Sequence, residues 1–90
     1  MKILDSDFRK ELYKNLVEAG YEKQEAQKIV GVKYYNALKD KCIMYINAGH
    51  ISIYELENIE EEFTLYKKLG GNGHMDALIA KVRKLKTTQE

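Results

Sequence analysis

Hydrophobic residues recur along this chain mostly at intervals of three and four, the spacing of an α-helix that buries one face. The pattern starts after Asp5 and Ser6, either of which can accept hydrogen bonds from the first backbone N–H groups of a helix. Gly20 ends it, because glycine readily adopts the left-handed conformation that closes many helices. The sequence therefore predicts a first helix over residues 6–19, with an apolar stripe of Phe8, Leu12, Leu16 and Ala19.

A second helical pattern runs up to Gly49 and is interrupted by Gly31. Before Gly31 one face carries Ala26, Ile29 and Val30, and after it an offset stripe carries Tyr34, Leu38, Cys42 and Tyr45. Since glycine costs about 1 kcal/mol relative to alanine inside a helix, the sequence leaves open whether this helix is continuous. Ile43 and Met44 lie away from the second stripe. A helix that is apolar on more than one side is central in its fold or forms an oligomer interface.

The third helix has the clearest start signal. Ser52 with Glu55 three residues later forms a capping-box pattern, and Ile51 with Leu56 forms a hydrophobic-staple pattern. The apolar stripe that follows alternates spacings of three and four: Leu56, Ile59, Phe63, Tyr66 and Leu69. That spacing is typical of a helix packed nearly antiparallel on another.

A fourth helix is predicted over residues 74–86, with the stripe Met75, Leu78, Ile79, Val82 and Leu85. The short "LGGNG" segment before it makes the last two helices an antiparallel helical hairpin. The terminal "TTQE" is expected to fray, and no strand pattern competes anywhere in the chain. The prediction is an all-α fold of about four helices in one domain, residues 1–90.

The glycine-rich loop has two interpretations. As a turn, Gly70 closes one helix, Gly71 spaces the chain and Asn72 caps the next. As an anion site, the backbone N–H groups of consecutive glycines bind a phosphate at a helix N-terminus, using Gly71, Asn72, Gly73 and His74. The turn is favoured because the loop matches no nucleotide-binding motif. Gly73 supports the anion site, since a plain turn does not need it. No cofactor is expected.

Charge argues against a dedicated nucleic-acid binder. Fifteen basic and fourteen acidic residues leave a net charge of +1, and such binders are usually more basic. The best nucleic-acid candidates are Lys81, Arg83, Lys84 and Lys86 of the fourth helix, extended by Lys28, Lys33, Lys39 and Lys41 of the second. A solubilising face balanced by the acidic third helix is the favoured interpretation. A nucleic-acid-binding accessory protein is kept as the second functional hypothesis.

The sequence indicates no catalytic or metal site. Cys42, His50 and His74 are three potential zinc ligands, but their spacing matches no zinc finger or ribbon. A lone cysteine on an apolar helix face is more often a small buried hydrophobe. We therefore expect no enzyme and no bound metal. The start of the chain does not read as a signal peptide, and no apolar run reaches the roughly 20 residues needed to span a bilayer. A cytoplasmic location is expected.

Seven of the ninety residues are tyrosine, a residue enriched at protein–protein interfaces because it combines a large apolar area with a polar tip. No helix can bury both Tyr34 and Tyr35 on one narrow face, and Tyr54 and Leu65 lie together off the stripe of the third helix. Filling of the core is the alternative interpretation for most of the tyrosines. We predict a partner-binding surface made of Tyr34, Tyr35, Ile43, Met44, Tyr54 and Leu65. A homodimer or a complex with another protein is the corresponding assembly.

Two segments resemble small helical proteins encoded by phages and prophages of Gram-positive bacteria: "LVEAGYEKQEAQKIVGVKYYNALK" and "LYKKLGGNGHMDALIAKVRKL". The more specific part is an aromatic residue, then Leu-Gly-Gly-Asn-Gly, then an apolar helix. The resemblance covers about half the chain and carries over no catalytic residue. It implies a small phage protein that binds and inhibits a host protein, including host defence nucleases.

Overall fold

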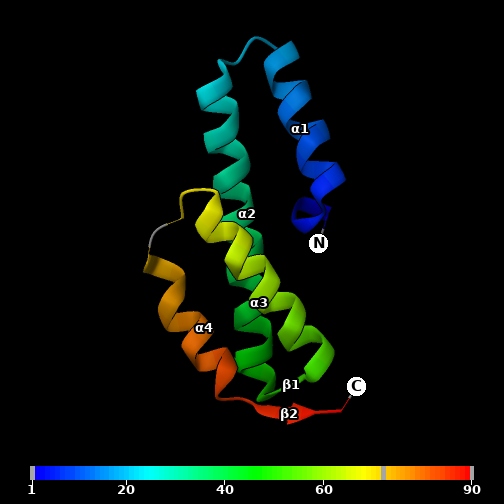
Figure 1. Cartoon of the computed structure of the whole chain (residues 1–90), viewed down its shortest axis with the longest axis vertical. Helices are drawn as coiled ribbons and strands as arrows, with labels where there is room; N and C mark the ends of the chain where they lie inside the picture. Colours follow the sequence, from blue (N-terminus) through cyan, green and yellow to red (C-terminus); the bar gives the residue numbers. More distant parts are fainter. Residues whose placement is uncertain (1, 72, 90) are drawn as a thin grey trace. The chain divides into compact units, whose positions relative to one another are not determined.

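The computed structural model describes residues 2–71 and 73–89. Within these, the chain is dominated by four α-helices, which confirms the all-α class (Figure 1). Two short 3-10 helices and two short strands complete it. In chain order the elements are η1 (Lys2–Leu4), α1 (Ser6–Glu18), α2 (Lys23–Ala48), β1 (His50–Ser52), α3 (Ile53–Lys68), η2 (Gly73–Met75), α4 (Asp76–Arg83) and β2 (Lys86–Thr88).

The chain divides into two compact units, the first ending at Ala37 and the second beginning at Leu38. The boundary falls inside helix α2, so both units contain a part of that helix. Each unit is described separately below. The single-domain organisation stays a prediction.

In the first unit, helix α1 begins and ends with defined caps. Asp5, and not Ser6, is the N-cap, because its carboxylate accepts a hydrogen bond from the Asp7 backbone N–H at 2.9 Å. At the other end, Gly20 has a φ of 104°. The backbone N–H groups of Gly20 and Tyr21 donate to the carbonyls of Val17 and Leu16, the bonding pattern of a Schellman motif. The helix therefore ends where the sequence predicts, within one residue.

Helix α1 contributes no fully buried residue. Phe8, the first residue of its predicted apolar stripe, is 40% exposed. Arg9 is better anchored, because its guanidinium donates to the Leu4 carbonyl at 2.6 Å and lies 4.9 Å from the centroid of the Tyr34 ring. Arg9 thus connects η1, α1 and α2 within the first unit.

Helix α2 is one continuous helix of 26 residues that passes through Gly31. No atom outside the local backbone lies within 4 Å of where a Gly31 Cβ would be, so this glycine is not required by a close neighbour. Of the two predicted stripes, Ile29 and Tyr45 are only half-buried. Ala37, which neither stripe included, is buried, and so are the other stripe residues: Ala26, Val30, Tyr34, Leu38 and Cys42.

In the second unit, Ser52 caps helix α3 as predicted. Its hydroxyl accepts a hydrogen bond from the Glu55 backbone N–H at 3.1 Å. The Glu55 carboxylate contacts helix α2 and forms an ion pair with Lys41 at 3.6 Å. Of the predicted α3 stripe, Ile59, Phe63 and Tyr66 are buried, Leu56 is half-buried and Leu69 is exposed.

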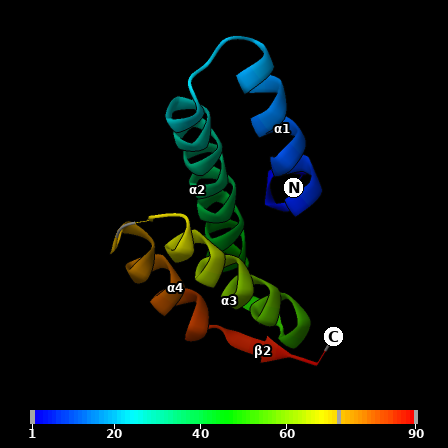
Figure 2. The same ribbon diagram turned by 45° about the horizontal axis from the view of Figure 1, so that its top comes forward.

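Helices α3 and α4 form the predicted antiparallel hairpin, as Figures 1 and 2 show. Helix α4 is shorter than expected. It begins at Asp76 after the 3-10 turn η2 and ends at Arg83, and its buried residues with η2 are Met75, Ile79 and Val82. The predicted end at Lys86 is wrong, because that residue leaves the helix and enters a strand.

The two strands form a small parallel sheet that the sequence did not indicate. His50, Ile51 and Ser52 pair with Lys86, Thr87 and Thr88. The expectation that the terminal segment frays is therefore wrong at Thr87 and Thr88. Three-residue strands are too short for alternation to be recognised in a sequence. Only Ile51 is fully buried in this sheet, at 1% exposure. Among the described residues, no helix is both long and apolar enough to cross a membrane.

Replacing the Ser52 hydroxyl tests the capping of helix α3. Ser52→Ala should lower the free energy of unfolding by about 0.5–2 kcal/mol, because the Glu55 N–H loses its acceptor. Ser6→Ala is the matched control, since Asp5 and not Ser6 caps α1, and it should change stability by less than Ser52→Ala. Urea unfolding followed by circular dichroism measures both. Equal effects of the two substitutions would contradict the assignment of the cap.

Candidate protein-interaction surface

An ion pair fixes which faces of α2 and α3 meet in the second unit. The Lys41 Nζ lies 3.0 Å from a Glu62 carboxylate oxygen and 3.6 Å from one of Glu55. All three side chains are largely buried, with 18–28% of each exposed. Tyr45, one turn after Lys41, also hydrogen-bonds Glu55, and its pKa is raised by burial and by that bond.

Helix geometry places Met44 on the outer side of this ion pair. On α2, Leu38 and Cys42 are fully buried on one side of Lys41, whereas Met44, three residues further on, falls on the other side. Met44 is 55% exposed. Ile43 lies further round the helix and is 39% exposed.

Tyr54 and Leu65 occupy the corresponding side of α3. They are eleven residues apart, which is close to three full helical turns, so they share one line of the helix. The buried Ile59 and Phe63 lie on the opposite side of Glu55 from that line. Tyr54 is 63% exposed and Leu65 is half-buried.

Met44, Tyr54 and Leu65 together form what we call the outer surface. The Tyr45–Glu55 hydrogen bond brings Met44 level with Tyr54, because each is the chain neighbour of a bonded residue. Helices α2 and α3 run antiparallel and meet at the ion pair. The side of each helix that lies away from its buried residues therefore faces the same direction. Three of the six predicted partner-binding residues therefore share one surface, and Ile43 borders it.

The remaining two predicted partner-binding residues lie in the first unit. The prediction that Tyr34 binds a partner is wrong, because Tyr34 is 0% exposed and its ring packs beneath the Arg9 guanidinium. A side chain without exposed area cannot contact a partner. The sequence showed that Tyr34 and Tyr35 cannot share one narrow face, and the structure turns Tyr34 inward and leaves Tyr35 half-buried.

The glycine loop is used to close helix α3. Gly70 has a φ of 90°, and the backbone N–H groups of Gly70 and Gly71 donate to the carbonyls of Lys67 and Tyr66. This is a second Schellman motif. The Gly71 N–H is therefore not available to an anion, and the prediction that Gly71 is part of an anion site is wrong. Asn72 lies outside the described residues.

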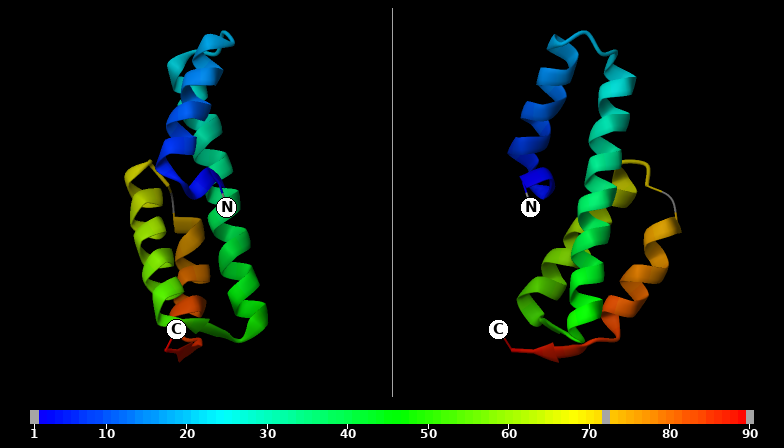
Figure 3. Two further views of the ribbon diagram at one scale, coloured as in Figure 1. Left: turned by 90° about the vertical axis from the view of Figure 1, so that its right-hand side faces the viewer. Right: turned by 180° about the vertical axis from the view of Figure 1, so that it is seen from behind.

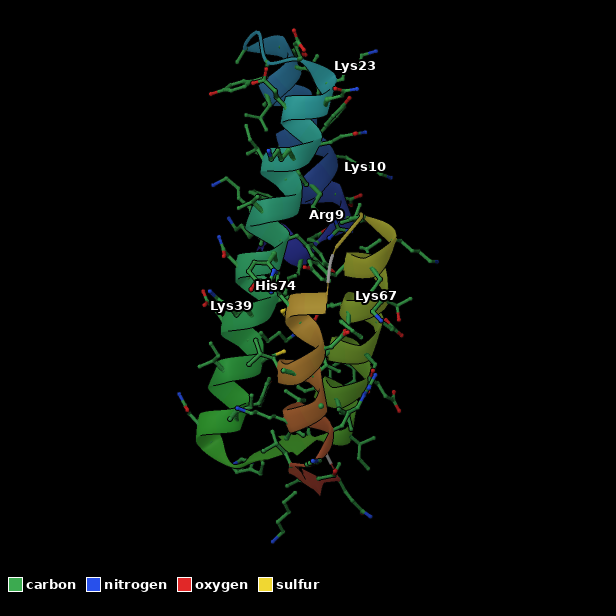
Figure 4. The ribbon with its side chains drawn as sticks, turned by 90° about the vertical axis from the view of Figure 1, so that its left-hand side faces the viewer. Arg9, Lys10, Lys23, Lys39, Lys67 and His74 are labelled. Atoms are coloured by element: carbon green, nitrogen blue, oxygen red, sulfur yellow. The ribbon has the colours of Figure 1, made fainter. Side chains whose placement is uncertain are left out.

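The side chains beside the loop also disfavour an anion. Asp76 points toward it, with one carboxylate oxygen 3.5 Å from where a Gly73 Cβ would be. The same carboxylate lies 3.8 Å from the Lys67 Nζ across the loop. Figure 4 shows Lys67 on α3 and His74 in η2 on either side of the loop. A carboxylate this close to Gly73 opposes phosphate binding there, and the paired Lys67 offsets only part of its charge.

Two of the predicted nucleic-acid-binding residues have carboxylate partners. Arg83 makes a bidentate contact with Glu60, with Nε and Nη2 donating at 2.6 Å and 2.7 Å. The hydrogen bond from Arg83 lowers the pKa of Glu60. Lys41 is held in the ion pair described above. Lys81, Lys84 and Lys86 are exposed, which leaves a smaller basic group than the sequence suggested.

Cys42 is a buried hydrophobe, as predicted. It has no exposed area, and burial, followed by the nearby Glu62 charge, raises the pKa of its thiol to about 11. Among the described residues, no group of three or more His, Cys, Asp or Glu side chains is placed to hold a metal ion. Comparison with known proteins found no matching family model, no similar curated protein and no similar solved structure. The phage-protein resemblance therefore stays a hypothesis.

Alanine substitutions in the loop separate its three glycines. Gly71→Ala should destabilise by about 1–3 kcal/mol, because the added Cβ would overlap the buried Tyr66 ring. Gly70→Ala should cost about 1–2 kcal/mol through its left-handed backbone. Gly73→Ala, which meets only an ordinary contact, is the control and should be nearly neutral. Chemical unfolding measures all three, and a destabilising Gly73→Ala would contradict the loop geometry.

The Arg83–Glu60 contact gives a pH-dependent contribution to stability. Because the pKa of Glu60 is lowered in the folded state, the contribution is complete above the ordinary value of 4.5 and is lost as pH falls through the lower folded value. Both side chains are more than one-third exposed, so Glu60→Gln should cost only about 0.2–1 kcal/mol at neutral pH.

Urea unfolding of the parent and of Glu60→Gln from neutral to acidic pH tests this dependence. The stability difference between the two proteins should shrink as pH falls below 4.5. Glu61→Gln, which removes the same charge from an exposed neighbour, controls for net charge. A difference that does not change with pH would contradict the effect of Arg83 on the Glu60 pKa.

Proposed function

We propose that this chain is a small helical interaction protein that binds a protein partner through the outer surface of α2 and α3. The observation that carries the proposal is the exposure of Met44 and Tyr54, at 55% and 63%, on one side of a half-buried ion pair. Large exposed apolar residues that lie together mark interaction sites. Tyrosine and methionine are enriched in the buried centres of such interfaces.

The contacts behind this surface also support a binding role. Met44 and Tyr54 are each next to a residue of the hydrogen-bonded and ion-paired group of Lys41, Tyr45, Glu55 and Glu62. A preformed surface loses less side-chain and backbone entropy on binding, which favours affinity. The proposal needs no conformational change in this unit.

The proposal includes a biological context and the absence of catalysis. The resemblance to small phage proteins suggests that the partner is a host protein and that binding inhibits it. A non-enzymatic role is supported by Cys42, since a buried thiol with a pKa of about 11 is a poor nucleophile at neutral pH. The nucleic-acid alternative has less support, because Arg83 and Lys41 are paired with carboxylates.

A pull-down from a Gram-positive bacterial lysate with matched charge substitutions tests the proposal. Met44→Lys, near the C-terminus of α2, and Tyr54→Asp, in the first turn of α3, both suit the helix dipole and should leave folding intact. Each should weaken partner capture about tenfold or more, as expected for a central interface residue. Val32→Lys, an exposed apolar-to-charged change in the first unit, is the control.

Nuclease treatment of the lysate separates the two functional hypotheses. Capture of a protein that survives nuclease and is lost in Met44→Lys and Tyr54→Asp, but not in Val32→Lys, supports the proposal. Capture that disappears with nuclease, and in Lys84→Ala, supports nucleic-acid binding instead. Capture that none of the outer-surface substitutions affects overturns the assignment of this surface.

A further inference from the structure

Strand β2 leaves one edge of its sheet unpaired. Within the described residues the sheet has two strands, and β2 pairs only with β1. Figures 1 and 3 show β2 beyond β1 at the end of the helices of the second unit, so its second edge points away from them. An unpaired edge presents backbone N–H and C=O groups that can pair with another strand.

The sheet is small for a parallel one. Parallel pairing is slightly weaker per residue than antiparallel pairing, and all-parallel sheets usually have both faces covered. Three or more strands, or packing against helices, are generally needed for a stable sheet. Here Ile51 is fully buried, but Lys86 and Thr87 are exposed. An additional strand on the β2 edge would therefore stabilise this end of the unit.

The side chains of β2 restrict which strand can join. Thr87 and Thr88 are β-branched, which suits pairing. Lys86 at the first position is the one charge in this strand, and an opposing cation there would be unfavourable. A joining strand must therefore place a neutral residue opposite Lys86.

A second copy of the chain meets this condition. Two copies related by a two-fold axis pair the same strand antiparallel to itself. When the axis passes at Thr87, the two Thr87 residues face each other and Lys86 faces Thr88 of the second copy. No like charges are opposed, and both unpaired edges are satisfied by one contact.

We propose that two copies of this chain associate through their β2 strands, in an antiparallel pair centred on Thr87. The product is a four-stranded sheet with the strand order β1-β2-β2-β1. Since three paired residues form a small interface, the dimer is weak and depends on concentration.

This dimer goes beyond the proposed function. It uses the edge of β2, whereas the partner-binding proposal uses Met44, Tyr54 and Leu65. The two can therefore fail separately.

Charge substitutions at the two-fold axis test the dimer. Thr87→Lys and Thr87→Glu each place two like charges directly opposite one another, which should weaken dimerisation about fivefold. An equal mixture of the two variants restores an opposite-charge pair and should restore the dimer. Ala80→Lys and Ala80→Glu, at an exposed position on α4, are the matched controls and should behave like the parent.

Sedimentation equilibrium over a micromolar-to-millimolar series measures the association, and circular dichroism checks that each variant is folded. In the parent alone, hydrogen–deuterium exchange at residues 86–88 should slow as concentration rises, which tests the interface without any substitution. A parent that stays monomeric throughout the series overturns the proposal. So does a dimer that persists in both Thr87 variants, or a failure of the mixture to restore it.

Discussion

The contact of Lys41 with Glu55 and Glu62 determines how helices α2 and α3 are rotated against each other. One ammonium group lies between two carboxylates at 3.0 Å and 3.6 Å, and all three side chains are largely buried. Removing a partner would leave a charge uncompensated in a poorly hydrated position, which is costly. In this arrangement Cys42, the chain neighbour of Lys41, is fully buried, and burial raises its thiol pKa to about 11. The same arrangement leaves Met44 and Tyr54 facing solvent.

Two helix ends in this chain are closed by the same backbone arrangement, and this accounts for two of the three glycines in its glycine-rich loop. At Gly20 and at Gly70 a glycine with positive φ allows two N–H groups to return to carbonyls of the last helical turn. A backbone N–H that satisfies a helix carbonyl is not available to a ligand. At Gly71 a further constraint applies, because any side chain there would occupy the position of the Tyr66 ring. Gly70 and Gly71 therefore meet steric and hydrogen-bonding demands of helix α3.

Most of the helical architecture could be predicted from local signals, and the departures have identifiable causes. Ser52, Gly20 and Gly70 act through their own backbone neighbourhood, so sequence patterns located these helix ends well. The β1–β2 pairing depends on residues more than thirty positions apart, and no local pattern in three-residue strands reports it. The candidate site was predicted only in part. Periodicity identified Met44 and Tyr54 as lying off the core stripes, and it also placed Tyr34 on one of them. Assigning Tyr34 to the partner surface followed the interface preference of tyrosine instead, and its burial beneath Arg9 agrees with the stripe.

The second unit exposes two surfaces of different chemistry, and each favours a different kind of contact. The outer surface of α2 and α3 offers apolar side chains, so a partner must match it in shape to exclude water. The β2 edge offers backbone hydrogen-bonding groups, so it accepts an extended strand with little regard to side-chain shape. β1 lies between helices α2 and α3 in the chain, whereas β2 follows α4 and pairs with β1. A strand that joined β2 would extend the sheet that already links the segment before α3 to the segment after α4, whereas a partner on the outer surface would contact helices α2 and α3 directly. The two contacts therefore act on different parts of the unit, and one does not obstruct the other through shared residues.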